Sequence, residues 1–478
     1  MSQTLDRRWP LQAAVRPQSL GFCLGVASAA AIGFGIFFPI APRTAIAVLL
    51  LIPLAFAAPV AAVSVLIAVT SLVPFEVQDS LSVIGGRDEP GLLFVDALMM
   101  LGLLRVGWLV VRRRMELDLP MLGAVAAALI CCAALAWGIS QGADTSEAGH
   151  EARRVVMGVA AFILAWPLVA DRSARRRLVW VLITLGLALG LWGVAQWMFS
   201  IDYTNSGDVG VRPGVDRVAG GRGMLQGGMF GYPVAITLAW AALVSGRVRK
   251  PPIRGILAVI VVLNAVCLVL TYERTIWLVT ALSCAVVVVM YGATAIRPAI
   301  RWAGLGLAAL VCLAAIAPGE AATALKRMMS VSQISTDNSF TYRIIESDAA
   351  IDAIAARPVT GSGLGATVTW EGQGIFATLT TSFIHNGYLW LAWKFGIPVA
   401  ALVVLLMVVA IVRRTPSGDS WQWRAVRVGS KASILGLLLV PITFPVFNVL
   451  GITPLMGFLL AVCYSREPAE PLIPARGL

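Results

Sequence analysis

Charged residues and histidine are both scarce in this sequence. Only 13% of its 478 residues are charged, whereas 59% are hydrophobic, and soluble domains carry about 25% charged residues. A chain with a mean hydropathy of +0.85 cannot hide so much apolar surface in a core surrounded by water. The composition therefore excludes an ordinary soluble domain and predicts a polytopic membrane protein.

Other absences narrow the kinds of site that the chain can hold. Its seven cysteines all fall inside apolar runs, where thiols serve as small packing groups. Neither a disulfide framework nor a Cys/His or carboxylate cluster with metal-site spacing is present. No nucleic-acid module accompanies the net charge of +12. We therefore expect no metal, no cofactor and no nucleic-acid partner, but contact with anionic membrane lipids.

Apolar runs of membrane-spanning length predict an all-α fold with about 14 transmembrane helices in a single integral domain, 1–478. Most of the basic clusters between these runs fall on the same side, which predicts cytoplasmic termini by the positive-inside rule. The predicted spans are 18–38, 41–57, 59–73, 93–111, 119–138, 155–170, 178–199, 227–245, 255–271, 276–294, 302–317, 386–411, 430–447 and 452–465.

Four polar segments then lie on the opposite side of the membrane: 74–92, 139–154, 200–226 and 318–385. The last is by far the longest, and loops of this length usually carry function. Within it, 340–356 reads as a helix that stops at Arg357-Pro358. Its apolar face would include Ile344, Ile345 and Ile351.

One of the two histidines, His385, lies where the long polar segment meets an apolar helix. An imidazole can exchange a proton near neutral pH, unlike the apolar residues around it. It could also be an ordinary interfacial histidine. Asn386 and Tyr388 add hydrogen-bonding groups beside it, and the intervening Gly387 allows close approach.

The second histidine, His150, lies near the end of the 139–154 segment, beside Glu151, Arg153 and Arg154. Its neighbours read as an ordinary charged surface run. We expect His150 to be structural or solvated.

Several arginines lie on the same predicted side as His385. Arg274 follows Glu273 in a very short connection, so its guanidinium either pairs with that carboxylate or meets a phosphate. Arg217 and Arg222 lie in the glycine-rich 200–226 segment, whose backbone could turn toward an anion. Arg343 is either an ion-pair partner of Glu346 one helical turn away or a further anion ligand.

A glycine-rich run, 361–365, follows the predicted helix of the long segment. Its G-x-G-x-G pattern resembles a nucleotide loop, but it follows a helix rather than a strand. We expect a tight turn that packs the segment back toward the membrane.

One titratable base and several arginines suit a substrate with a diphosphate leaving group and an acceptor hydroxyl. Arginines would stabilise the charge that builds on the diphosphate. The histidine would take the acceptor proton or orient the hydroxyl. This combination favours an enzyme that works at the membrane surface.

The sequence resembles the O-antigen ligase and O-antigen polymerase superfamily of bacterial envelope enzymes. The resemblance rests on Arg343, on the 358–365 run, on His-Asn-Gly-Tyr-Leu at 385–389 and on Phe-Gly-Ile at 395–397. The 272–278 stretch is similar to the family's Ser-Arg helix start, with Glu273 in place of the usual Ser. The arginine-containing loop before 227–245 is similar to the family's upstream arginine loop, but more weakly.

The resemblance implies a fold of the GT-C type with a large periplasmic loop, in a multi-pass protein of the bacterial inner membrane. It implies inverting, metal-independent transfer of a glycan from undecaprenyl diphosphate to an acceptor sugar hydroxyl. The acceptor would be lipid A-core for a ligase, or a lipid-linked repeat unit for an O-antigen or exopolysaccharide polymerase. His385 matches the family's essential histidine, Arg274 and Arg222 its diphosphate arginines, and Arg343 the arginine of the loop's second helix.

Two other readings stay open. A transporter or flippase of lipid-linked oligosaccharide would carry charged residues near the middle of the bilayer and broken helices in both halves. Asp96, Arg105 and Lys394 are the few candidates, and no repeated halves are visible. A purely structural scaffold would leave the long 318–385 segment unexplained.

Overall fold

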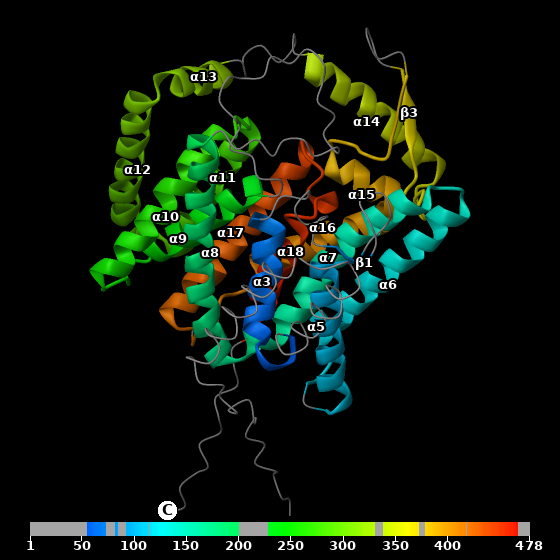
Figure 1. Ribbon diagram of the computed structural model, residues 1–478, viewed down its shortest axis with the longest axis horizontal. Coiled ribbons are helices and arrows are strands. Elements are labelled where there is room, and N and C mark those ends of the chain that lie inside the picture. Colours follow the sequence, from blue (N-terminus) through cyan, green and yellow to red (C-terminus); the bar gives the residue numbers. More distant parts are fainter. Residues whose placement is uncertain are drawn as a thin grey trace, which may run out of the picture.

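The computed structural model describes residues 55–72, 82–84, 92–113, 115–199, 228–329, 338–371, 378–416 and 418–466, and most of them are helical (Figure 1). The predicted 18–38 span lies outside the described residues. So does the 200–226 segment with Arg217 and Arg222.

Seven of the described helices are long and apolar enough to cross a membrane, and four further apolar helices are shorter. This confirms an all-α polytopic membrane protein, while the expected count of about 14 stays a prediction. The long helices are α6 (Leu119–Ser140), α7 (Thr145–Ala170), α8 (Arg172–Met198), α10 (Pro251–Leu270), α11 (Arg274–Tyr291), α12 (Ile296–Ile316, preceded by η1, Ala293–Ala295) and α17 (Trp421–Leu439, followed by η3, Val440–Ile442). The shorter ones are α3 (Pro59–Leu72), α9 (Gly228–Val244), α16 (Ile397–Val412) and α18 (Thr453–Tyr464).

The centre of the bundle is formed by α7, α9, α17 and α18, with α5 (Phe94–Val111) and α3 beside α7 (Figure 1). Glycines bring α7 and α18 into direct backbone contact: a Cβ on Gly158 would lie 2.9 Å from the carbonyl oxygen of Thr453, and one on Gly457 would strike the carbonyl of Gly158. Small residues at a crossing let helices pack closely where lipid offers no hydrophobic driving force.

Side-chain caps set several helix starts. Asp118, Asp144 and Asp171 accept backbone N–H bonds at the beginnings of α6, α7 and α8. The cap at Asp144 begins α7 ten residues earlier than the apolar pattern does. The predicted 139–154 loop was therefore wrong, because only a short turn separates α6 from α7.

Two predicted spans also have different bounds in the structure. The 386–411 span is two helices, α15 (Gly387–Phe395) and α16, which are separated by Gly396 at φ 84°. The 430–447 span begins earlier, at Trp421, and its helix ends at Leu439. It therefore carries Arg427 inside α17, whereas the predicted spans place this residue between two helices.

At one end of the bundle, at the top of Figure 1, lie α13 (Pro318–Met329) and α14 (Asn338–Ala356). The predicted 340–356 helix is thus confirmed. Of its predicted apolar face, Ile345 packs against the core, but the other two residues do not. Ile344 and Ile351 are 47% and 50% exposed, whereas Glu346, Ala350 and Ile354 are buried. A carboxylate lies on the packed face of α14, and its partner is described below.

The described residues form two small antiparallel hairpins. One pairs β1 (Ser82–Ile84) with β2 (Leu92–Leu93). The other pairs β3 (Val368–Trp370) with β4 (Leu379–Thr381), with Thr369 opposite Thr380. The second hairpin leads directly into His385.

The glycine run folds into a tight turn, 361–365, as predicted. Gly361, Gly363 and Gly365 have φ between 68° and 81°, a region that favours glycine. The N–H of Gly363 donates to the carbonyl of Lys394 at 3.1 Å, and that of Leu364 to the carbonyl of Ala134 at 3.0 Å. This glycine turn therefore joins the end of α15 to α6.

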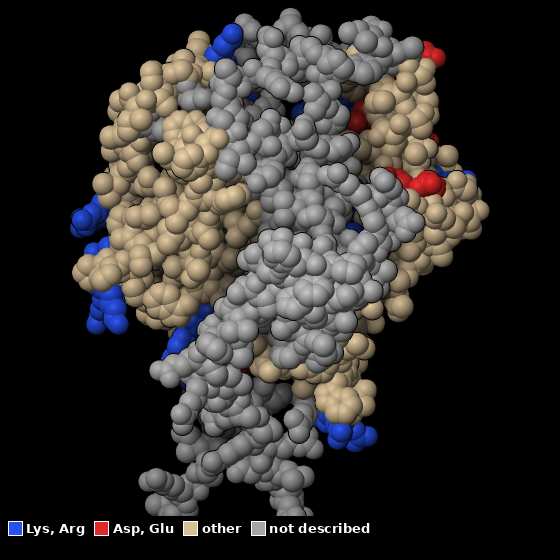
Figure 2. Space-filling model, viewed as in Figure 1, with Lys and Arg blue, Asp and Glu red and all other residues tan. Residues whose placement is uncertain are grey.

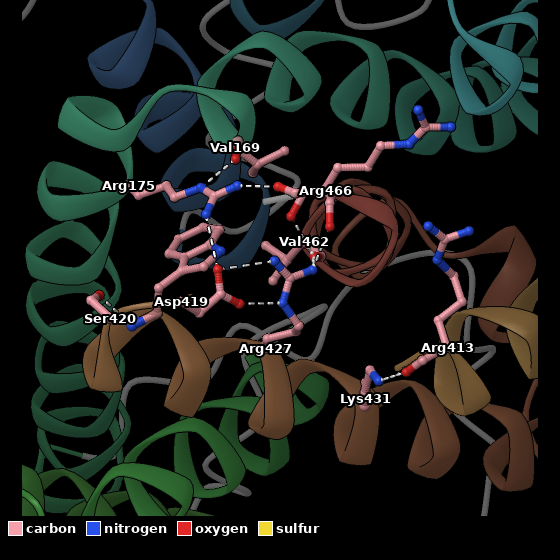
Figure 3. Close-up of polar contacts among 11 residues, drawn as sticks. Val169, Arg175, Arg413, Asp419, Ser420, Arg427, Lys431, Val462 and Arg466 are labelled. Carbon is pink, nitrogen blue, oxygen red and sulfur yellow. Dashed lines mark hydrogen bonds and ion pairs between the residues drawn. The ribbon is translucent and has the colours of Figure 1, made fainter. Parts of the chain in front are cut away.

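Around the N-terminal half of α17, charged side chains form a buried cluster (Figure 3). The carboxylate of Asp419 accepts from Arg175 of α8 at 3.0 Å and from Arg427 of α17 at 2.8 Å. Arg427 also donates to the carbonyls of Val462 and Ser465 at the end of α18. These bonds satisfy the charge and the N–H groups of Arg427, so this side chain can lie inside the protein with only 1% of its area exposed.

On the face drawn in Figure 2, most Lys and Arg side chains surround the lower half, and the acidic ones lie at the upper right. The side of the membrane on which each end lies stays a prediction of the positive-inside rule.

We expect Gly363→Ala to destabilise the protein by about 2–4 kcal/mol, since a side chain at positive φ is strained and the added carbon would strike the backbone of Gly138. Gly304→Ala is the matched control, because a Cβ there meets open space. Thermal unfolding of the purified protein in detergent measures both variants. Equal stability of the two would contradict the packing of the glycine turn.

We also expect Asp419→Asn to cost about 3–5 kcal/mol, because it leaves two buried guanidinium groups without their counter-charge. Asp352→Asn, on the exposed side of α14, should unfold at the wild-type temperature. An Asp419→Asn variant as stable as wild type would mean that the carbonyl groups alone satisfy Arg175 and Arg427.

Candidate functional site

His385 lies in a short segment that is fixed on both sides. The preceding Ile384 is fully buried. The following Asn386 caps α15, because its side chain accepts the N–H groups of Tyr388 at 3.0 Å and Leu389 at 3.1 Å. The imidazole between them is 32% exposed. The local sequence thus holds the backbone firmly and leaves part of the ring accessible.

The carboxylate of Glu346 meets His385 twice. Its Oε2 accepts the backbone N–H of His385 at 3.0 Å and lies 2.9 Å from Nδ1 of the ring. The side chain of Glu346 is only 5% exposed. This explains why a carboxylate lies on the packed face of α14.

The alternative that paired Glu346 with Arg343 was therefore wrong. Glu346 bonds to His385 instead, and among the described residues the buried Nε of Arg343 has no hydrogen-bond partner. Sequence spacing favoured the pair one helical turn apart, whereas the bond to His385 joins residues 39 positions apart. The only sequence signal was a carboxylate among apolar residues of a predicted helix.

Two neighbours hold the imidazole and its helix in place. The ring of Phe383 packs edge-on against the ring of His385, with centroids 5.0 Å apart. The hydroxyl of Tyr388 donates to the carbonyl of Leu438 in α17. Asn386 and Tyr388 therefore support the position of α15.

Helix α7 also supports this segment. Glu147 accepts a hydrogen bond from Ser382 at 2.6 Å. Glu151 has no exposed area, lies 2.9 Å from Nζ of Lys394 and accepts the N–H of Gly365 at 2.6 Å. The prediction of a charged surface run was therefore wrong for Glu151, which is buried against α15 and the glycine turn.

The charged residues that a transporter would use are also paired. Asp96 of α5 bonds to Arg153 of α7 with both carboxylate oxygens, at 3.0 and 2.6 Å. Lys394 bonds to Glu151 and to the carbonyl of Ala366. Arg105 donates to the carbonyl of Phe56 at 3.3 Å. These contacts tie neighbouring segments together.

Arg274 is the first residue of α11, after a three-residue turn in which Tyr272 has a φ of 56°. The turn is as short as predicted, and Arg274 and Glu273 are both partly buried. A positive φ at a non-glycine residue is uncommon and costs energy that the surrounding packing must offset. Here the backbone is fixed at the point where Arg274 begins its helix.

Three helix starts converge on one short segment, 440–445. Thr275 of α11 and Thr443 lie 3.3 Å apart through their hydroxyl oxygens. Gly387 of α15 is so close that a Cβ would lie 3.1 Å from Pro441 and from Pro445. The ring of Phe230 in α9 lies 5.0 Å from that of Phe444.

The structure thus gathers the starts of α9, α11 and α15 at one end of the bundle. The positive ends of helix dipoles and their free N–H groups favour negative charge. His385 directly precedes α15, and Arg274 begins α11. Arg217 and Arg222 lie outside the described residues. No group of three or more metal-binding side chains lies together in the described part of the chain.

One part of the chain matches a known family. Residues 257–404 match the family described as O-antigen ligase, and this range includes Arg274, Arg343 and His385. A search of curated proteins found no match. Over 257–404, less than half of its length, the chain is therefore similar to the O-antigen ligase family.

Proposed function

We propose that the chain transfers a glycan from an undecaprenyl-diphosphate-linked donor to a sugar hydroxyl of an acceptor, at the periplasmic face of the bacterial inner membrane. The single observation that carries this proposal is the convergence of α11 and α15 on 440–445, within and beside the matched segment. It places Arg274 and the accessible imidazole of His385 at helix starts, whose N–H groups favour anions. A fold of the GT-C type would suit this arrangement.

The diphosphate of the donor would lie against the arginines. Arg274 offers a planar fork of donors that matches phosphate geometry. Arg343 adds a buried Nε that has no hydrogen-bond partner among the described residues. Arg222 or Arg217 would close the site from the 200–226 segment. Together they would stabilise the charge that develops as the diphosphate leaves.

His385 would act as the general base. The acceptor oxygen attacks the anomeric carbon while the bond from that carbon to the diphosphate oxygen breaks. The hydroxyl proton passes to the imidazole, and undecaprenyl diphosphate departs with the bonding electron pair. Attack opposite the leaving group inverts the anomeric centre. The diphosphate leaves without an added proton, so the step needs no metal ion.

Ligase and polymerase use the same donor chemistry, so the proposal covers both. A ligase would accept lipid A-core, and a polymerase would accept a new lipid-linked repeat unit of O-antigen or exopolysaccharide. The transporter reading is less favoured, because Asp96 and Lys394 are already engaged in close ion pairs. Breaking such buried pairs costs several kcal/mol.

His385→Ala should lower glycan transfer by about 100-fold or more, since a general base contributes 10²–10⁴-fold. Transfer from an undecaprenyl-diphosphate donor to acceptor glycan, followed with the purified protein in liposomes, measures the loss. His150→Ala is the control and should transfer normally. If the His385→Ala variant inserts, folds and keeps wild-type activity, the mechanism is wrong.

Arg274→Lys should lower transfer by about 10- to 100-fold, because a point charge does not replace the bidentate contact of a guanidinium. Arg301→Lys, at an exposed position of α12, controls for the loss of an arginine elsewhere. Full activity of Arg274→Lys in the same assay would favour a structural ion pair for Arg274.

A further inference from the structure

A carboxylate on the packed face of α14 is the feature least explained by folding alone. Among Glu346, Ala350 and Ile354, which are all buried, only Glu346 carries a charge. Burying a carboxylate in apolar surroundings is costly unless hydrogen bonds offset the loss of water. Its bonds go to the backbone N–H and ring Nδ1 of His385.

We infer that Glu346 is the positioning residue for His385 in the proposed transfer reaction, on which this inference rests. Its carboxylate accepts the proton of Nδ1 and thereby fixes the tautomer of the neutral ring. Nε2 is then the nitrogen with a free lone pair. The base that receives the acceptor proton is therefore Nε2.

Two contacts and the exposure of the ring make this arrangement specific. The backbone N–H of His385 donates to Oε2 of Glu346 at 3.0 Å, and this bond holds the carboxylate beside His385 independently of the ring. The ring of Phe383, which packs edge-on, restricts rotation of the imidazole. The ring keeps 32% of its area exposed although the carboxylate that it contacts is only 5% exposed.

The carboxylate has a second consequence for the reaction. When Nε2 takes the acceptor proton, the ring becomes an imidazolium, and the negative charge beside Nδ1 stabilises it. A carboxylate that orients a base and stabilises its charged form is a recurring arrangement in acyl-transfer enzymes. Here Glu346 comes from the long 318–385 segment and His385 from its end, so docking of α14 orients the base.

The tautomer can be measured without any turnover. The chain has only two histidines, so His150→Gln leaves His385 as the single ring. With ring-¹⁵N-labelled histidine, NMR in alkaline buffer distinguishes a protonated nitrogen from a bare one. We expect a single form with Nδ1 protonated and Nε2 bare. Glu346→Ala should give a mixture of the two tautomers, and Asp348→Ala, on the exposed side of α14, should not.

Activity gives the second readout. Glu346→Ala should lower kcat by about 10- to 100-fold with little change in KM, part of the 10²–10⁴-fold that a general base contributes. Glu346→Gln keeps an oxygen that can accept from Nδ1 but removes the charge, so it should keep the tautomer and lose less activity. If the alanine variant fails to fold, the tautomer and kcat are measured on Glu346→Gln instead.

The outcomes separate the two proposals. A tautomer ratio that Glu346→Ala leaves unchanged, or a normal kcat in that variant, overturns the positioning role. An active His385→Ala protein overturns the proposed base whatever the tautomer. Loss of activity in both Glu346 variants with the wild-type tautomer and reduced thermal stability would assign Glu346 a purely structural role.

Discussion

The ion pair between Glu151 and Lys394 holds together the part of the protein on which the site depends. Neither side chain has exposed area, and both lie on helices of a membrane protein, where unpaired charge is costly. The pair joins α7 to α15. Through Gly365 and Ala366 it also engages the glycine turn. Breaking a pair of this kind leaves a buried charge without compensation, at about 3–5 kcal/mol.

The cost of an unpaired buried charge shapes both ends of the bundle. At one end the carboxylate of Asp419 and the carbonyls at the end of α18 satisfy two buried arginines. At the other end Glu346 is satisfied by His385. Asp419, Glu346 and Glu151 are thus each buried carboxylates with a partner on another element. The arrangement at Asp419 is structural, whereas the one at Glu346 leaves part of a titratable ring accessible.

Much of the architecture could be predicted because it depends on local properties. Apolar runs give helices of spanning length, and three glycines spaced two residues apart give the tight turn at 361–365. The stop before Pro358 also follows from local sterics. Helix starts were predicted less well. Asp144 extends α7 by a side-chain cap through residues that hydropathy alone assigns to a loop.

The residues of the proposed site were predicted as types and positions, but their partners were not. His385 was singled out because imidazoles are rare in this chain and this one lies at a membrane boundary. Its bond to Glu346 joins residues 39 positions apart, and nothing in the spacing indicates it. The partner that spacing suggested for Glu346, as one of two alternatives for Arg343, lay one helical turn away, because spacing can identify only neighbours on the same helix.

By itself, therefore, the sequence determined that the chain is helical, lies in a membrane and presents a histidine after a long polar segment. Those properties follow from hydropathy and from short-range sterics. Only the tertiary structure decided which charges meet: Glu346 with His385, Glu151 with Lys394, and Asp419 with two arginines. The reason is physical, since each of these contacts forms between elements that packing brings together, and the cost of an unpaired charge in a membrane acts on the folded arrangement.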